Sequence, residues 1–170
     1  MSEVYVENEV VPVPVTAMSP REILNAYYRA MRDKSPDDLA DLYAVDAVHE
    51  FPFAAPGFPP RFAGREEVRA GYRAAWGASP VTVSDIRDVV VHETADPAVL
   101  IAEHVVVGTL PGPDATVTVP GLLVLRVDGA GRLAHVRDYM DGYGVAAARG
   151  DAAAENASAG DLHERSPADD

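Results

Sequence analysis

The sequence of 170 residues contains no cysteine, which excludes a disulfide framework, a thiol nucleophile and a thiolate zinc site. Basic residues are few: 14 of them, with Lys34 the single lysine, stand against 27 acidic residues and give a net charge of −13. Such a charge repels the phosphate backbone, so a nucleic-acid partner is excluded. No run approaches the roughly 20 apolar residues of a membrane span. The N-terminus has no basic region followed by an apolar run, so it does not resemble a secretory signal. We therefore expect a cytoplasmic protein with no membrane partner.

Motifs for metals and nucleotides are also missing. The sequence has no His-x-His, no His-Glu-x-x-His and no acidic calcium loop. No glycine-rich loop joins a strand to a helix with the spacing that phosphate binding requires. We expect no metal and no cofactor.

The composition, with 48% hydrophobic residues, predicts one compact domain over residues 19–143. Residues 1–18 are rich in valine, but Pro12 and Pro14 exclude a central strand, which favours an extended N-terminal arm. Residues 144–170 have a net charge of −4 and almost no aliphatic residue larger than alanine. This segment cannot bury enough apolar surface to offset its ordering entropy, so we expect a disordered acidic tail.

Three helices are predicted in the first half of the domain. Ser19–Glu22 forms a capping box with proline at the first helical position, which begins a helix that runs to about Arg32. Ser35–Asp38 repeats the start signal and predicts a short helix through Tyr43. Gly64 begins a third helix with an apolar stripe at i, i+4 and i+8. That stripe consists of Val68, Tyr72 and Trp76.

Strands dominate the second half. His49 to Phe53 is predicted to be a short strand, and a Pro/Gly loop follows at 55–60. Four β-rich runs come later, at about 81–92, 98–109, 115–127 and 132–140. The short, turn-rich gaps between these runs predict hairpins and an antiparallel sheet. Helices followed by a long meander indicate an α+β fold in which the helices cover one face of the sheet.

This order of elements resembles the SnoaL-like branch of the nuclear transport factor 2-like superfamily over residues 19–143. Besides the paired N-terminal helices, the residues that carry the resemblance are Phe51-Pro-Phe53, Phe62–Glu66 and Gly131–Asp141. The resemblance implies a curved antiparallel sheet wrapped into a cone (an α+β barrel), closed by about three N-terminal helices around an apolar pocket. It also implies a homodimer formed through the outer sheet face. Relatives include polyketide cyclases, ketosteroid isomerases, limonene epoxide hydrolases and proteins that only bind ligands.

The sequence departs from each branch of the family. The cyclases and ketosteroid isomerases carry an aspartate on the penultimate strand, whereas Pro120 to Leu123 here has no ionisable group. The last strand, Val136–Asp141, closely matches the epoxide-hydrolase branch. On the middle strand, however, the arginine and aspartate of that branch are replaced by His104 and Val106. Glu93–Pro97 and the last strand also resemble the corresponding parts of the phenazine-biosynthesis A/B proteins. Their polar residues on the third helix are replaced by Gly71 and Ala75.

The first catalytic candidates are His104 and Asp138. Side chains alternate along strands, so both can face the pocket, where the carboxylate would orient the imidazole and the imidazole would move a proton. Two alternatives stay open. Asp138 can pair with Arg137 or Arg126 on a wet face, or Glu103 can point inward and His104 toward a dimer partner.

His49 is the third catalytic candidate, since it shares a face with Phe51 and Phe53; a buried structural histidine is the alternative. The residues expected to bind substrate are aromatic or apolar and lie on the helical stripes or the inner strand faces: Tyr27, Phe51, Phe53, Tyr72, Trp76, Val106, Leu123 and Met140. Tyr139 is expected on the outer face, and His92, His135 and His163 at the surface.

The resemblance and the candidate residues together predict a cofactor-independent cyclase or isomerase of secondary metabolism. Its substrate would be a largely apolar, polyketide-like molecule held in an enclosed pocket. Catalysis would use either acid/base chemistry or the templating of substrate conformation. Two other hypotheses remain: an epoxide-hydrolase-like enzyme, and a dimer that binds a small hydrophobic ligand without turnover.

Overall fold

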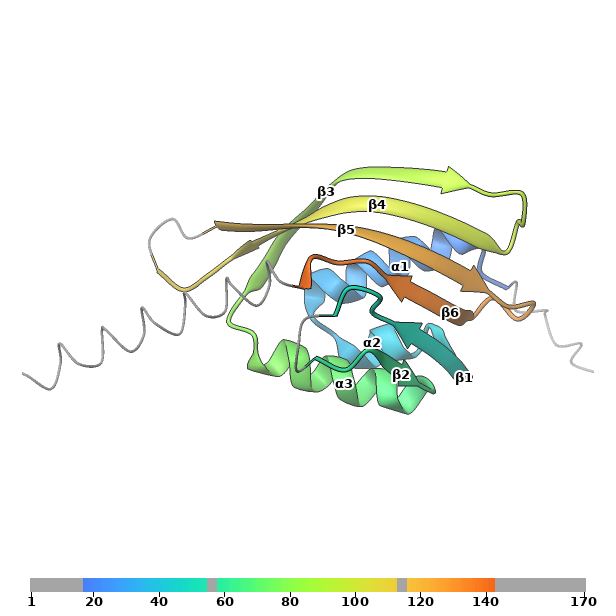
Figure 1. Cartoon of the computed structure of the whole chain (residues 1–170), viewed down its shortest axis with the longest axis horizontal. Coiled ribbons are helices and arrows are strands. Elements are labelled where there is room, and N and C mark those ends of the chain that lie inside the picture. Colours follow the sequence, from blue (N-terminus) through green and yellow to red (C-terminus); the bar gives the residue numbers. More distant parts are fainter. Residues whose placement is uncertain (1–16, 55–57, 113–115, 143–170) are drawn as a thin grey trace, which may run out of the picture.

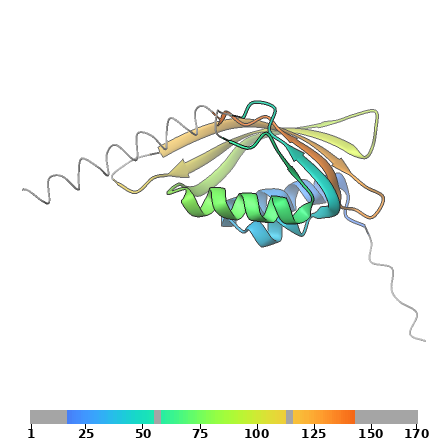
Figure 2. The ribbon, with the colours of Figure 1, turned by 60° about the horizontal axis from the view of Figure 1, so that its bottom comes forward.

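A computed structural model describes residues 17–54, 58–112 and 116–142. In this part of the chain an open, curved sheet of six strands packs against three helices on one of its faces (Figures 1 and 2). The predicted α+β fold is confirmed. The predicted arm at 1–18, apart from residues 17 and 18, and the predicted tail at 144–170 lie outside the described residues.

The helices begin where the sequence signals predicted. Helix α1 spans Pro20–Asp33, and the Ser19 hydroxyl and the Glu22 carboxylate form the expected capping box. Helix α2 is short, Pro36–Ala40, with the Ser35 hydroxyl accepting a hydrogen bond from the Asp38 backbone N–H. Helix α3 spans Arg65–Ala78. The predicted extension of α2 to Tyr43 is wrong, because Tyr43 already pairs with Leu133 as the first residue of a strand.

The strands are β1 Tyr43–Glu50, β2 Arg61–Ala63, β3 Thr82–Glu93, β4 Val99–Thr109, β5 Thr116–Val127 and β6 Leu133–Asp138. Their order in the sheet is β2-β1-β6-β5-β4-β3. The meander β3-β4-β5-β6 is antiparallel as predicted. The first strand differs from the prediction of 49–53: it starts six residues earlier, ends before Phe51 and pairs with β6 in parallel. The sheet is therefore mixed, and the short strand β2 had not been predicted.

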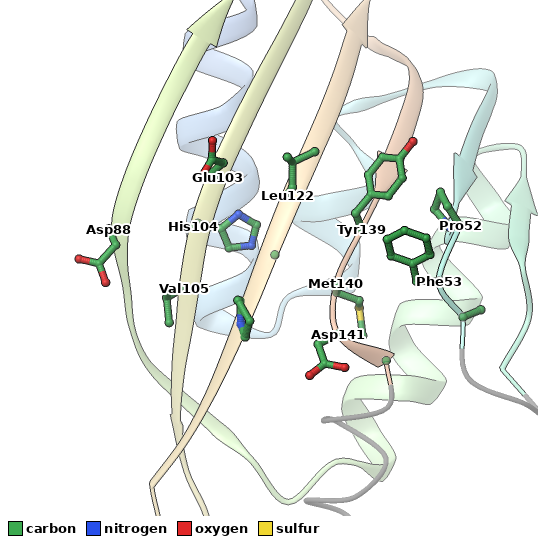
Figure 3. Close-up of a pocket in the computed structure, with 14 residues that line it drawn as sticks. Pro52, Phe53, Asp88, Glu103, His104, Val105, Leu122, Tyr139, Met140 and Asp141 are labelled. Atoms are coloured by element: carbon green, nitrogen blue, oxygen red, sulfur yellow. The ribbon is translucent and has the colours of Figure 1, made fainter.

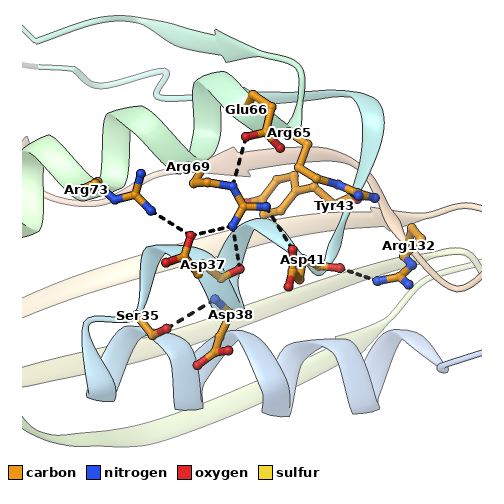
Figure 4. A network of polar contacts seen from close by, with 10 residues as sticks. All are labelled: Ser35, Asp37, Asp38, Asp41, Tyr43, Arg65, Glu66, Arg69, Arg73 and Arg132. Carbon is orange, nitrogen blue, oxygen red and sulfur yellow. Dashed lines mark hydrogen bonds and ion pairs between the residues drawn. The ribbon is translucent and has the colours of Figure 1, made fainter.

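An ion-pair network fastens α3 to α2 (Figure 4). The Arg69 guanidinium on α3 contacts the carboxylates of Asp37, Asp41 and Glu66 at 2.7 to 3.1 Å, and Arg73 contacts Asp37 at 2.8 Å. Arg65 donates hydrogen bonds to the backbone carbonyl of Tyr43. These contacts hold the N-terminal half of α3 beside the start of β1, and so help to position the side chains that α3 places over the sheet.

Candidate active site

A cavity of about 460 Å³ lies between the helix-covered face of the sheet and α3. This volume is within the range of small-molecule sites. Its walls are mostly apolar and aromatic, and they include six of the eight residues expected to bind substrate: Phe51, Phe53, Tyr72, Trp76, Val106 and Met140. His104 and Asp138 also line it. Eight of the residues that the sequence singled out therefore border one cavity.

Asp138 is the acidic group of this wall. It ends β6, pairs with Leu123 across the sheet and is 6% exposed. Burial raises the pKa of Asp138 to about 7, although a hydrogen bond from the Met140 backbone N–H and another from Tyr72 act in the opposite direction. Near neutral pH this carboxyl group can therefore both accept and release a proton, which is what general acid/base catalysis requires.

His49 lies behind Asp138 and has no exposed surface. Its Nε2 is 3.8 Å from Oδ2 of Asp138 and 3.3 Å from the Tyr72 hydroxyl, and its Nδ1 is 2.7 Å from the Tyr43 hydroxyl. Burial, with a smaller effect from His135, lowers the pKa of His49 to about 3. The imidazole is thus neutral at physiological pH, and its contact with Asp138 is not an ion pair.

His104 occupies the opposite side of the same face. It is 5% exposed, it pairs with Gly121, and its ring meets Tyr28 edge to face at a centroid distance of 5.3 Å. Its Nδ1 has no hydrogen-bond partner among the described residues. Burial lowers the pKa of His104, against a smaller opposite effect of a hydrogen bond to the Ala102 backbone, so this imidazole is also neutral at physiological pH. Glu103 is exposed, so His104, and not Glu103, is the inward-facing residue of this pair.

The structure does not bring His104 and Asp138 into direct contact. They are on β4 and β6, two strands apart, and their partners on β5, Gly121 and Leu123, are two residues apart. With standard strand spacing and rise, the two Cα atoms are separated by roughly 12 Å. The two side chains border one cavity from different sides, so a ligand between them can touch both. The nearer imidazole to Asp138 is that of His49.

Two residues expected to bind substrate lie deeper than the cavity wall. Tyr27 is fully buried, and its hydroxyl is 3.2 Å from that of Tyr72. Leu123 is 1% exposed and belongs to the hydrophobic core. Phe53, in contrast, is more exposed than expected for a residue that binds substrate. It follows the end of β1, is 63% exposed and borders the cavity at its edge.

A second depression, a groove of about 850 Å³, borders the sheet near the end of β6 (Figure 3). Glu103, Leu122 and Tyr139 contribute to it, and Tyr139 is not among the residues that line the inner cavity. His104, Gly121 and Met140 border both the groove and the cavity. The groove therefore adjoins the inner site at this end of β5.

The remaining histidines do not join the cavity. His92 contacts Glu103 at 2.8 Å, His135 contacts Glu50 at 2.9 Å, and His163 lies outside the described residues. Within residues 17–54, 58–112 and 116–142, no three His, Asp or Glu side chains are arranged to hold a metal ion. None of the three helices described is long and apolar enough to cross a membrane.

Sequence reasoning missed two residues of the site. Tyr43 was expected at the end of a helix, yet it starts β1 and contacts His49. Gly121 leaves room for an imidazole: a Cβ at this position would lie 2.9 Å from Nε2 of His104. The glycine in an apolar strand was the available signal, since glycine in a strand interior often marks a close approach.

A family model and one curated relative match this chain. The model of the SnoaL-like domain matches residues 24–136. An uncharacterised PhzA/B-like protein of Pseudomonas aeruginosa is 35% identical over 86 residues, which are 51% of this chain and 59% of that protein, so the chain spans less than two thirds of the length of this relative.

Solved structures agree on the fold. A candidate isomerase from Bacillus subtilis superimposes with a TM-score of 0.68 at 25% identity, over 76% of this chain and 91% of that one. The Δ5-3-ketosteroid isomerase from Mycobacterium sp. has a TM-score of 0.57 at 22% identity, over 72% and 93% of the two chains. With most of its described residues matched by the domain model, this chain belongs to the SnoaL-like family.

Proposed function

We propose that this protein is a cyclase or isomerase that needs no cofactor and acts on a largely apolar, carbonyl-bearing metabolite of polyketide type. The observation that carries the proposal is a buried carboxyl group, Asp138, which faces an apolar cavity of 460 Å³ and whose pKa burial raises to about 7. A base with a pKa near the working pH is the most effective one for moving a proton between carbon atoms.

In this proposal Asp138 removes a proton from the carbon next to the substrate carbonyl and returns it to another carbon, which isomerises the substrate. In a cyclase the enolate carbon instead forms a bond to the carbon of a second carbonyl in the same substrate, the π bond of that carbonyl breaks, and its oxygen takes the proton from Asp138. The carbonyl oxygen gains negative charge during the step. His104 is the donor for this oxygen in the tautomer that carries the proton on Nε2, the tautomer favoured because Nδ1 makes no well-aligned hydrogen bond among the described residues. The apolar walls hold the chain in a reactive conformation and exclude water.

Trp76 makes a direct test possible, because it is the single tryptophan of the chain and lines the cavity. Apolar ketones and 1,3-diketones are added to the protein, and those that quench the fluorescence of Trp76 are taken as ligands of the cavity. For those ligands the protein should accelerate exchange of the α-hydrogen with deuterium from D2O, which mass spectrometry measures. Ligands that bind without any accelerated exchange would contradict the proposal and favour the non-catalytic reading.

Gly121→Ala should displace the imidazole of His104. The new methyl group would lie 2.9 Å from Nε2 and 3.1 Å from Cε1, closer than such atoms approach, so the ring must tilt. We expect ketone affinity, measured by Trp76 fluorescence, to fall roughly three- to tenfold, the size of one neutral hydrogen bond. Unchanged affinity together with unchanged ring resonances of His104 would contradict this role of Gly121.

The mostly apolar lining of the cavity favours one alternative, a module that binds a hydrophobic ligand without turnover. An epoxide hydrolase is the other; oxygen-18 from labelled water would enter its product, whereas ring closure or isomerisation adds no water. The homodimer through the outer sheet face stays a prediction. That face offers half-buried apolar side chains for it, among them Val105, Leu122 and Val124.

A further inference from the structure

A chain of buried polar side chains leads from the start of β1 to Asp138. The Tyr43 hydroxyl is 2.7 Å from Nδ1 of His49, and Nε2 of the same ring is 3.3 Å from the Tyr72 hydroxyl. Tyr72 also hydrogen-bonds to the carboxyl group of Asp138. Tyr43 and His49 have no exposed surface, and only Tyr72 and Asp138 border the cavity.

The number of protons limits which groups can donate and which can accept in this row of hydrogen-bonded side chains. A neutral imidazole has one nitrogen that donates and one that accepts. The Tyr43 hydroxyl is fully buried, so its hydrogen must be donated within the protein, and two acceptors are in reach: Nδ1 of His49 at 2.7 Å and the hydroxyl of Tyr27, to which Tyr43 also hydrogen-bonds. Nε2 faces Tyr72 and, at 3.8 Å, a carboxyl group that only accepts when it is ionised.

We propose that Tyr43 is a positioning residue that fixes His49 in the Nε2–H tautomer, with this N–H directed at Tyr72 and Asp138. The Tyr43 O–H donates to Nδ1, the His49 Nε2–H donates to the oxygen of Tyr72, and the Tyr72 O–H donates to the carboxylate. Each of these three hydrogen bonds is then donated in the direction of Asp138. This arrangement stabilises the ionised carboxyl group, which is the form that removes a proton in the proposed function. The contribution of Tyr43 to catalysis therefore rests on the proposed function, whereas its effect on the tautomer of His49 does not.

The structure holds Tyr43 firmly in this place. Arg65 of α3 donates hydrogen bonds to its backbone carbonyl (Figure 4), and Tyr43 pairs with Leu133 of β6. The pairing of β1 with β6 is irregular between Tyr43 and Val48. Six residues of a straight strand would span roughly 20 Å, so this irregularity is what lets the Tyr43 hydroxyl reach the imidazole of His49.

Other titratable groups also face His49 and Asp138. Tyr27 and Tyr28 of α1 and Tyr72 of α3 pack against the pair from the helix side. His104 of β4 borders the same cavity farther from Asp138, and His135 of β6 affects the pKa of His49. The tyrosines in this set are protonated at physiological pH, since burial raises their pKa values further. Tyr28 provides a matched control, because its hydroxyl is buried but has no hydrogen-bond partner among the described residues.

The test is the ring 15N spectrum of the ligand-free full chain with labelled histidine, recorded at neutral pH. The His49 signals are assigned by their loss in His49→Gln. We expect wild-type His49 as the neutral Nε2–H tautomer, Tyr43→Phe to convert it to a tautomer mixture or to Nδ1–H, and Tyr28→Phe to leave it unchanged. Tyr43→Phe should also move the Asp138 titration upward by about half a pH unit, roughly the effect of one weak hydrogen bond.

Wild-type His49 found as the Nδ1–H tautomer, or as the charged ring, would overturn the proposal, even if Tyr43→Phe failed to fold. A spectrum that Tyr43→Phe leaves unchanged, or that Tyr28→Phe changes equally, would also overturn it. Because no substrate is present, these results are independent of catalysis. Failure of the deuterium-exchange assay would refute the proposed function and leave the tautomer assignment standing.

Discussion

Asp138→Asn is expected to slow α-hydrogen exchange in a bound ketone by about 10²- to 10⁴-fold, the usual contribution of a positioned general base. Asparagine keeps the shape of the side chain and can still hydrogen-bond with Tyr72, but its amide cannot accept a proton from carbon. Affinity for the ketone should change little, because the apolar walls that hold it are untouched. Mass spectrometry of the exchanged ligand and titration of Trp76 fluorescence measure the two effects separately.

Asp141→Asn provides the control for this experiment. Asp141 follows Asp138 by three residues and is exposed at the edge of the outer groove, so the same chemical change there should leave the exchange rate unaltered. A loss of only a few-fold in Asp138→Asn would contradict acid/base catalysis. Such a result would mean that the cavity acts by folding the substrate so that its reacting atoms meet.

Asp138 and His49 should give the stability of the protein two opposite dependences on pH. Between pH about 4 and about 7 the unfolded chain releases the proton of Asp138 while the folded protein retains it, so this residue makes stability fall as pH rises. Between about 3 and about 6.5 the unfolded chain binds a proton at His49 that the folded protein does not, so stability rises with pH. In the overlap the two effects largely cancel.

Single substitutions should reveal each dependence. Relative to wild type, Asp138→Asn should become more stable as pH rises from 4.5 to 6.5, by up to about 1.4 kcal/mol per pH unit, and His49→Gln should become less stable by a similar amount. Urea denaturation at three pH values across this range measures the differences, and subtraction of the wild type removes the contribution of all other groups. Two difference profiles with the same sign would show that one of the two pKa assignments is wrong.

The sequence predicted the elements whose signals are local. The capping residues of α1 and α2, the stripe Val68, Tyr72 and Trp76, and the three hairpin gaps each depend on a few neighbouring residues. Alternation along β4 and β6 also predicted correctly that His104 and Asp138 face the helices, because one face of each strand is buried.

Properties set by distant contacts were not predictable. The parallel pairing of β1 with β6 joins residues about 90 positions apart in the sequence, and no local signal marks it. The irregularity in β1 brings Tyr43 to His49, a contact that regular strand geometry would exclude. A contact between the side chains of His104 and Asp138 was expected because both lie on the same face of the sheet. Their offset of two residues along β5 became visible only with the register of both ladders.

The titration of the Asp138 carboxyl group tests the central claim most directly. Side-chain 13C resonances of the aspartates can be followed with pH in the ligand-free protein, and Asp138→Asn identifies the signal that belongs to this residue. The account predicts a midpoint near pH 7, as expected for a carboxyl group buried beside a neutral imidazole. A midpoint near 4, the value of a carboxyl group in water, would contradict the proposed acid/base role of Asp138.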